Sequence, residues 1–76
     1  MIADQPTAAQ VAKRIRLQVE RHNLTIAKAA KDCGISNASF EDYLYAKSLP
    51  GAVALAGLAK GLRCPVGWLL TGEFNV

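Results

Sequence analysis

Residues 25–45, TIAKAAKDCGISNASFEDYLY, decide the fold of this 76-residue chain. Apolar side chains recur there at helical spacing on both sides of Gly34, namely Ile26, Ala29, Ala30, Cys33, Phe40, Tyr43 and Leu44. Gly34 suits the left-handed residue that ends a helix, and Ser36 suits the N-cap of the next one. Ala30 is small enough for two closely joined helices to cross. The stretch therefore predicts a helix-turn-helix.

The sequence on either side predicts three more helices. Thr7 and Gln10 form a capping-box pattern at the start of the first, and an apolar stripe follows as far as Val19. Pro50 and Pro65 mark the starts of the last two. The five expected helices span about residues 7–22, 26–33, 37–45, 51–62 and 65–71. We therefore predict one compact all-α domain over residues 1–76.

The fourth expected helix is built almost entirely of small and apolar residues. We expect its inward face to be Ala52, Leu55, Ala56, Leu58, Ala59 and Leu62. The opposite side then carries Ala54, Gly57 and Gly61, although each interior glycine costs about 1 kcal/mol relative to alanine. Either this strip packs against another helix, for instance in a second subunit, or the helix is poorly stabilised there. Together with Phe74 in the tail, the strip is our candidate dimer interface.

Composition excludes several functional classes. The chain is 51% hydrophobic and 20% charged, which is a globular profile, and it has no apolar run long enough for a membrane and no targeting signal. We therefore expect a cytoplasmic protein with no membrane partner. Cys33 and Cys64 lie on apolar stripes, which favours buried thiols over a disulfide. His22 has no partner for metal or catalytic chemistry, so we expect no enzyme, metal, cofactor or small-molecule ligand.

Charge is unevenly distributed along the chain. Residues 11–31 carry six basic side chains and one carboxylate, whereas residues 32–46 carry three carboxylates and no basic side chain. A polyanion would be attracted by the segments around the third expected helix rather than by that helix itself. On the third helix, the outward candidates for reading bases are Asn37, Ala38, Glu41, Asp42 and Tyr45.

Motifs spread along the chain carry a family resemblance. They are Arg14-Ile15-Arg16, Leu24-Thr25, Ala30, Gly34-Ile35-Ser36, Ser48-Leu49-Pro50, Leu58-Ala59-Lys60 and the closing GWLLTGE of residues 67–73. On these motifs, residues 12–73 resemble the Cro/CI-type (XRE) helix-turn-helix family, in particular the N-terminal DNA-binding domains of phage CI-like repressors. The resemblance implies a five-helix, lambda-repressor-like domain whose helix-turn-helix is formed by helices two and three.

The resemblance also implies a function. Family members bind operator DNA as dimers, with the third helix in the major groove, so the partners implied are double-stranded DNA and a second copy. The implied activity is that of a sequence-specific transcriptional regulator, a phage or prophage-type repressor. The residues that would approach phosphates are Arg14, Arg16, Thr25, Lys28, Ser36, Ser39 and Lys47.

Ile26, Ala38, which has no hydrogen-bonding side chain, and Asp42 depart from the family pattern, and several positions leave alternatives open. Ile26 stands where the family usually has glutamine, and it either joins the core or contacts a thymine methyl. Asn37 suits adenine recognition but is also common at a helix start. Glu41 and Asp42 either accept from cytosine or form a solvated face. The alternative function is an adaptor or antitoxin-like module that binds protein through the small-residue strip, Leu17 and the acidic third helix.

Overall fold

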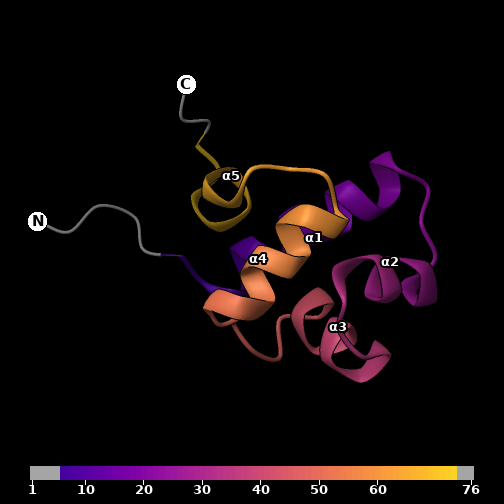
Figure 1. Ribbon diagram of the computed structural model, residues 1–76. Coiled ribbons are helices and arrows are strands. Elements are labelled where there is room, and N and C mark those ends of the chain that lie inside the picture. The colour runs from indigo at the N-terminus through magenta and orange to yellow at the C-terminus, as the bar shows by residue number, and fades with distance from the viewer. Residues whose placement is uncertain (1–5, 74–76) are drawn as a thin grey trace, which may run out of the picture.

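The computed structural model describes residues 6–73, which contain five helices and no strand (Figure 1). The helices are α1 (Ala8–Arg21), α2 (Ile26–Cys33), α3 (Asn37–Leu44), α4 (Ala52–Gly61) and α5 (Val66–Thr71). Each begins and ends within one residue of its predicted limits, because several predicted ranges included the capping residues. The predicted all-α, five-helix fold is confirmed.

Hydroxyl side chains begin the first three helices as predicted. Thr7 Oγ1 accepts a hydrogen bond of 3.2 Å from the backbone N–H of Gln10 at the start of α1. Thr25 Oγ1 accepts one of 3.1 Å from Lys28 at the start of α2. Each cap satisfies a backbone donor that the first helical turn leaves without a partner.

Helices α1 to α4 end in the same way, each with a left-handed residue after the last turn. The left-handed residues are Asn23, Gly34, Ala46 and Arg63, with φ of 54°, 73°, 61° and 59°. In each case the following backbone N–H bonds a carbonyl five residues earlier, as in Lys47 to Asp42 at 2.8 Å and Cys64 to Ala59 at 3.0 Å. The sequence predicted the role of Gly34, but Ala46 and Arg63 give no such signal because neither residue type favours positive φ.

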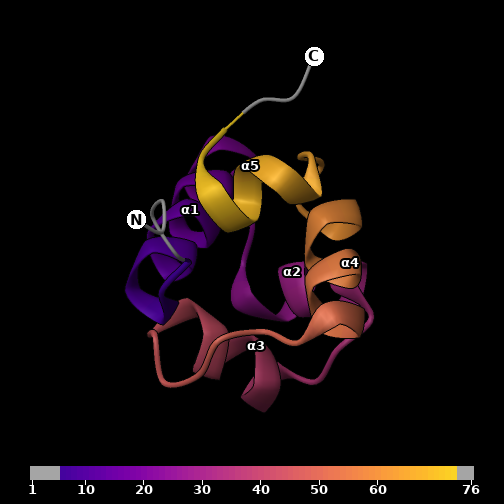
Figure 2. The same ribbon diagram turned by 90° about the vertical axis from the view of Figure 1, so that its left-hand side faces the viewer.

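The core lies where the five helices meet. α1 packs against α3 and α5, α2 packs against α3 and α4, and α4 packs against α5. Figure 2 shows α3 and α5 on opposite sides of the molecule. Fully buried large side chains at the centre are Val11, Ile15, Phe40, Leu58, Leu62 and Leu69. Ile26 packs against this cluster while half-buried, in agreement with the core interpretation of that residue.

The inward face of α4 differs from the predicted one. Ala52 and Ala56 are exposed, while Gly57 and Gly61 face α2. A Cβ at Gly57 would lie 2.5 Å from the carbonyl oxygen of Cys33, and a Cβ at Gly61 would lie 2.5 Å from Cys33 Sγ. The glycines therefore permit close packing against a helix of the same chain, which corrects their assignment to a dimer interface.

The contacts with Cys33 do not test the other two members of the predicted interface, Ala54 and Phe74. Ala54 is half-buried on α4, and Phe74 lies outside the described residues. They stay a prediction for the dimer interface.

A buried glutamine joins α1 to the end of α4. Gln18 is 2% exposed, and its Nε2 donates a hydrogen bond of 2.8 Å to the carbonyl oxygen of Leu62. Its Oε1 accepts one of 2.9 Å from Arg21 Nη1. Gln18 was not predicted to be buried, because its polar side chain lies between apolar neighbours on the inward face of α1.

Both cysteines are free thiols, as predicted. Cys33 is buried at the end of α2, and Cys64 is half-buried after α4. Burial raises the pKa of the Cys33 thiol from 9.0 to about 11, with smaller contributions from Asp32 and Cys64. Burial also raises the pKa of Cys64, partly offset by Arg21.

Candidate nucleic-acid interface

The outward face of α3 brings together the predicted base-reading residues. Asn37, Ala38, Asp42 and Tyr45 are exposed, and Glu41 is half-buried beside them. On the opposite face Phe40 and Leu44 are buried in the core, which fixes the rotation of α3 about its axis. Tyr45 is the residue that follows the helix, and it is 54% exposed. This face offers an amide, a methyl group, two carboxylates and a phenol, but no cation.

The hydroxyl groups predicted to approach phosphates are arranged around the turn and the helix starts. Ser36 Oγ accepts a hydrogen bond of 3.1 Å from the backbone N–H of Ser39 and donates one of 3.1 Å to Ser39 Oγ. Thr25 begins α2 in the same way. The residues therefore hold the starts of α2 and α3, where exposed N–H groups and the helix dipole favour an anion.

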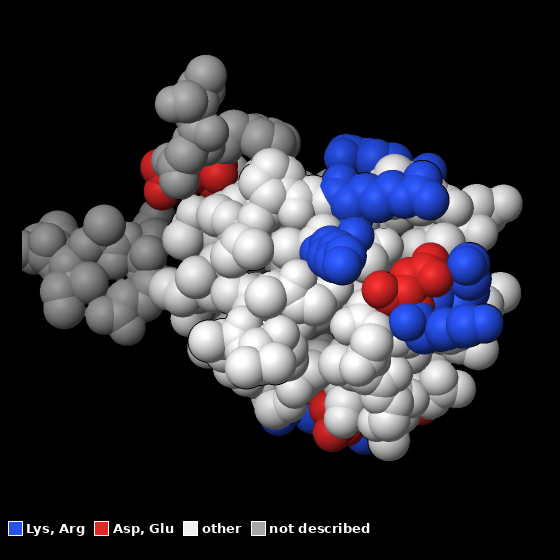
Figure 3. All heavy atoms as spheres, viewed as in Figure 1, with Lys and Arg blue, Asp and Glu red and all other residues white. Residues whose placement is uncertain are grey.

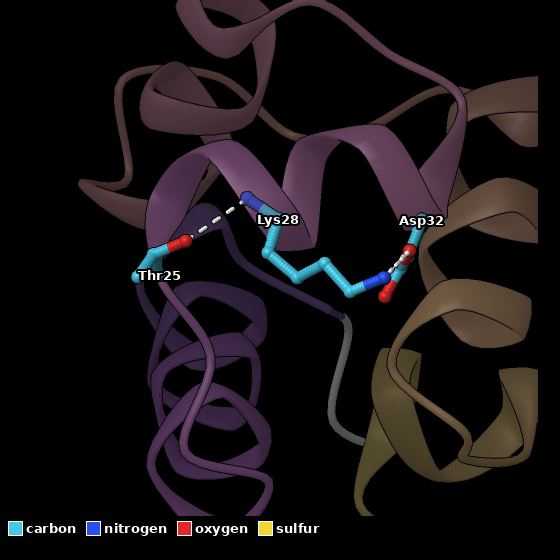
Figure 4. A network of polar contacts seen from close by, with 3 residues as sticks. All are labelled: Thr25, Lys28 and Asp32. Atoms are coloured by element: carbon cyan, nitrogen blue, oxygen red, sulfur yellow. Dashed lines mark hydrogen bonds and ion pairs between the residues drawn. The ribbon is translucent and has the colours of Figure 1, made fainter.

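Lys28 is the cation that lies nearest to the start of α2 among the predicted contacts. Its Nζ forms an ion pair of 3.0 Å with Asp32 one turn later (Figure 4). The Lys28 side chain is 60% exposed, so this pair contributes little to stability and its ammonium group is accessible to another anion.

Arg16 connects α1 to the end of α3. Its Nη1 donates a hydrogen bond of 2.7 Å to the carbonyl oxygen of Leu44, the last residue of α3. Lys47 follows three residues later and is exposed, while its backbone N–H is fixed to Asp42 at 2.8 Å. Two cations therefore flank the C-terminal end of the helix that itself has none.

The Arg14 side chain lies against α5 and not beside α3. Its Nη1 donates hydrogen bonds of 3.4 Å and 3.0 Å to the carbonyl oxygens of Leu69 and Leu70 in α5. Its guanidinium group covers Gly72, where a Cβ would lie 2.8 Å from Nη2. These contacts hold the side chain at α5, away from α3, and its role as a phosphate contact stays a prediction.

The surface charge follows the distribution expected from the sequence. Figure 3 shows Lys and Arg gathered over α2 and the neighbouring helix ends, with acidic atoms between them. Much of the remaining described surface in this view carries no charge. Electrostatic attraction for a polyanion is therefore supplied by the elements beside α3.

Neither a metal-ligand cluster nor a membrane-spanning helix is found among the described residues. Residues 6–73 bring together no group of three or more His, Cys, Asp or Glu side chains that could hold a metal ion. Across the same residues, every helix is too short or too polar to cross a membrane.

Comparisons with known proteins identify the fold. No family model and no curated protein matches the sequence. Among solved structures, the P22 c2 repressor in complex with synthetic operator 9T in the presence of Tl+ is similar at a TM-score of 0.77 and 27% identity, covering 83% of this chain and 96% of that one. The solution structure of the P22 c2 repressor DNA-binding domain is similar at a TM-score of 0.78 and 23% identity, covering 96% and 92%.

Both neighbours are Cro/CI-type helix-turn-helix domains, and neither is an enzyme. The resemblance drawn from the sequence is thereby confirmed, as is the lambda-repressor-like fold with its helix-turn-helix at α2 and α3. The chain therefore has the fold of these repressor DNA-binding domains.

Proposed function

We propose that this chain is a sequence-specific transcriptional regulator that binds an operator as a homodimer, as a phage or prophage repressor does. The observation that carries the proposal is its likeness, over 83% of its length and at 27% identity, to a repressor solved on operator DNA. The exposed outer face of α3 is the second support, because Phe40 and Leu44 hold that face toward solvent. Such a regulator acts in the cytoplasm of a bacterial cell.

Base recognition falls to α3 in this proposal. Asn37 is suited to paired hydrogen bonds with the N6 and N7 atoms of adenine, and Ala38 to contact with a thymine methyl. Glu41 and Asp42 are suited to accept from the amino group of cytosine. Tyr45 supplies an aromatic ring at the end of the same face.

Phosphate contacts fall to the elements around α3. Lys28, Arg16 and Lys47 provide the charge, while Thr25, Ser36 and Ser39 shape the helix starts. Three cations neutralise few phosphates, so one domain binds weakly at physiological salt. Two copies double the footprint, and their half-sites would lie one helical turn apart, about 34 Å. Ala54 and Phe74 are the residues we assign to contact between copies.

The test begins with enrichment of bound sequences from a random duplex library, followed by fluorescence anisotropy on the enriched duplex at two salt concentrations. We expect steep salt dependence and, for Asn37→Ala, a loss of discrimination worth about 1–3 kcal/mol at one base position. Lys28→Ala should weaken binding to all sequences and reduce the salt slope by about one. Lys13→Ala is the matched control, because Lys13 is an exposed lysine of α1 outside the proposed contacts.

The dimer is tested separately by sedimentation of the chain alone and with duplex. A species with two chains on one duplex is the expected result. Absence of any duplex binding at low salt would refute the DNA-binding proposal, and a single chain on every bound duplex would refute the dimer.

A further inference from the structure

We propose that the groove between α1 and α5 is a docking site for an acidic segment of another protein that carries an apolar anchor residue. The groove is an open hollow of about 610 Å³, and the lining residues that matter here are Lys13, Arg14, Arg16, Leu17, Glu20 and Trp68. Figure 2 shows α5 beside α1 with α3 on the opposite side of the molecule. The inference goes beyond the proposed function and does not depend on DNA binding.

The groove has an apolar part. Leu17 lies off the buried stripe of α1 and is 41% exposed, and half-buried Trp68 of α5 lines the same hollow. Single exposed leucines are ordinary on protein surfaces. A leucine and an indole that line one concave site, however, form an apolar surface to which an apolar side chain can bind. The volume is within the range of about 300–1,000 Å³ that is usual for ligand sites.

The groove is also basic. Lys13, Arg14 and Arg16 line it with Glu20 as the single carboxylate among the described lining residues. Both arginines are held in place, Arg14 by carbonyl oxygens of α5 and Arg16 by that of Leu44. These bonds are made through Nη1, which leaves the donors of Nε and Nη2 outside them. A fixed guanidinium group loses less entropy when it binds a carboxylate.

Charge and shape together select the occupant. A second copy that presented the same basic groove would bring like charges together, which disfavours a two-fold contact at this site. A nucleic-acid backbone has no apolar group to fill the space between Leu17 and Trp68. A peptide with several carboxylates around a leucine or phenylalanine satisfies both parts of the groove.

Trp68 makes the proposal measurable, because it is the single tryptophan of the chain and it lines the groove. The probes are three synthetic peptides: an acidic peptide with a central Leu-Phe pair, the same peptide with lysines in place of its acidic residues, and the acidic peptide with serines in place of Leu-Phe. We expect the first to shift Trp68 emission saturably and the other two to bind at least about tenfold more weakly. Backbone amide shifts in NMR spectra should change along α1 and α5.

Variants locate the site. Leu17→Ser and Lys13→Glu should each weaken the first peptide about fivefold or more, since one removes part of the apolar surface and the other reverses a charge. Val53→Ser and Lys31→Glu are the matched controls, because both residues are exposed outside the groove, and they should leave the affinity unchanged. Circular dichroism checks that each variant is folded.

Four outcomes would overturn the proposal. They are absence of a saturable shift at millimolar peptide, equal binding of the lysine peptide, unchanged affinity in both groove variants, and binding of a duplex without the enriched sequence that Leu17→Ser weakens as strongly as it weakens the peptide. The last would assign the groove to nucleic acid instead of protein. Because the assay contains no operator, its failure is distinct from failure of the proposed function.

Discussion

Arg16 of α1 donates a hydrogen bond of 2.7 Å to the carbonyl oxygen of Leu44, the residue at which α3 ends. The last turn of α3 contains no basic residue of its own, while Glu41 and Asp42 lie in its C-terminal half. Carboxylates near a helix C-terminus interact unfavourably with the negative end of the helix dipole. A guanidinium group at the last carbonyl compensates for this unfavourable interaction. The helix assigned to base recognition thus depends on α1 for its C-terminal charge.

The first prediction concerns a substitution that removes the charge of Arg16. Arg16→Met keeps most of the side-chain length and should lower the free energy of unfolding by about 1–2 kcal/mol, since a hydrogen bond from a charged donor is lost. Urea unfolding followed by circular dichroism measures it. Lys13→Met is the control, because Lys13 is an exposed cation on the same helix. Equal stability of the two variants would show that the contact with Leu44 contributes nothing.

The second prediction concerns the left-handed residue after α3. Ala46 has a φ of 61°, a conformation in which a Cβ costs roughly 1–2 kcal/mol and glycine has no such cost. Ala46→Gly should therefore raise the free energy of unfolding by about 0.5–1 kcal/mol. The gain is smaller than the cost of the Cβ because glycine increases the conformational entropy of the unfolded chain. Thermal unfolding should move upward by several degrees.

A second alanine serves as the control for Ala46→Gly. Ala56 is exposed and lies inside α4, where glycine should cost about 1 kcal/mol. Both substitutions replace alanine by glycine, so changes of opposite sign in the free energy of unfolding would be due to the different backbone conformations of the two positions. A loss of stability in both would contradict the left-handed assignment of Ala46.

The third prediction tests the contact between α2 and α4. Alanine at Gly61 would place its Cβ 2.5 Å from Cys33 Sγ and 2.6 Å from the backbone nitrogen of Cys33. Because the backbone of α2 or α4 would have to move, Gly61→Ala should lower the free energy of unfolding by about 1–3 kcal/mol, although alanine has the better helix propensity. Gly51→Ser is the control, since Gly51 has open space around its Cβ position and a serine can cap α4. A stable Gly61→Ala variant would contradict the close packing.

The sequence predicted the helices because their signals are local. Hydroxyl caps such as Thr25, the turn at Gly34 and the apolar periodicity of α1 and α2 each depend on residues within a few positions. The outward face of α3 followed from the same periodicity. Local signals were therefore enough for the five helices and the outward face of α3, whereas the lambda-repressor-like fold was implied by the family resemblance.

The remaining features depend on contacts between distant residues. Nearly every position of α4 is small or apolar, so periodicity could not distinguish the face of Ala56 from that of Gly57, and the approach of Cys33 decides it. Arg14 and Arg16 look alike in sequence, but one reaches α5 and the other reaches α3. Helix C-terminal carbonyls carry no sequence signal, which is why these partners were not predicted.

The fourth prediction concerns the buried glutamine. Gln18→Met fills a similar volume but removes the donor to Leu62 O and the acceptor for Arg21. Because the Leu62 carbonyl then lies buried without this partner, the free energy of unfolding should fall by about 1–3 kcal/mol. Gln10→Met, at an exposed position of the same helix, is the control. Equal unfolding midpoints in urea would contradict the prediction.

The last prediction concerns pH. The pKa of Cys33 rises from 9.0 to about 11 on folding, chiefly because burial disfavours the thiolate. Below pH 9.0 the thiol is protonated in both states, so its contribution to stability is fully present. Between 9.0 and about 11 the unfolded chain releases this proton while the folded chain retains it, and the free energy of unfolding falls as pH rises.

Urea unfolding across this pH range measures the effect. Lysines and tyrosines titrate there too, so the informative quantity is the difference between the chain and Cys33→Ala, whose stability should fall less steeply with pH. Alkylation by iodoacetamide gives a second measurement, because the thiolate is the reacting form. Cys33 should react more slowly than half-buried Cys64 in the folded chain, and the two rates should converge in urea. Two results together would contradict a buried, protonated Cys33 at the contact of α2 with α4. They are a parallel dependence of stability on pH in the chain and in Cys33→Ala, and equal alkylation rates of Cys33 and Cys64 in the folded chain.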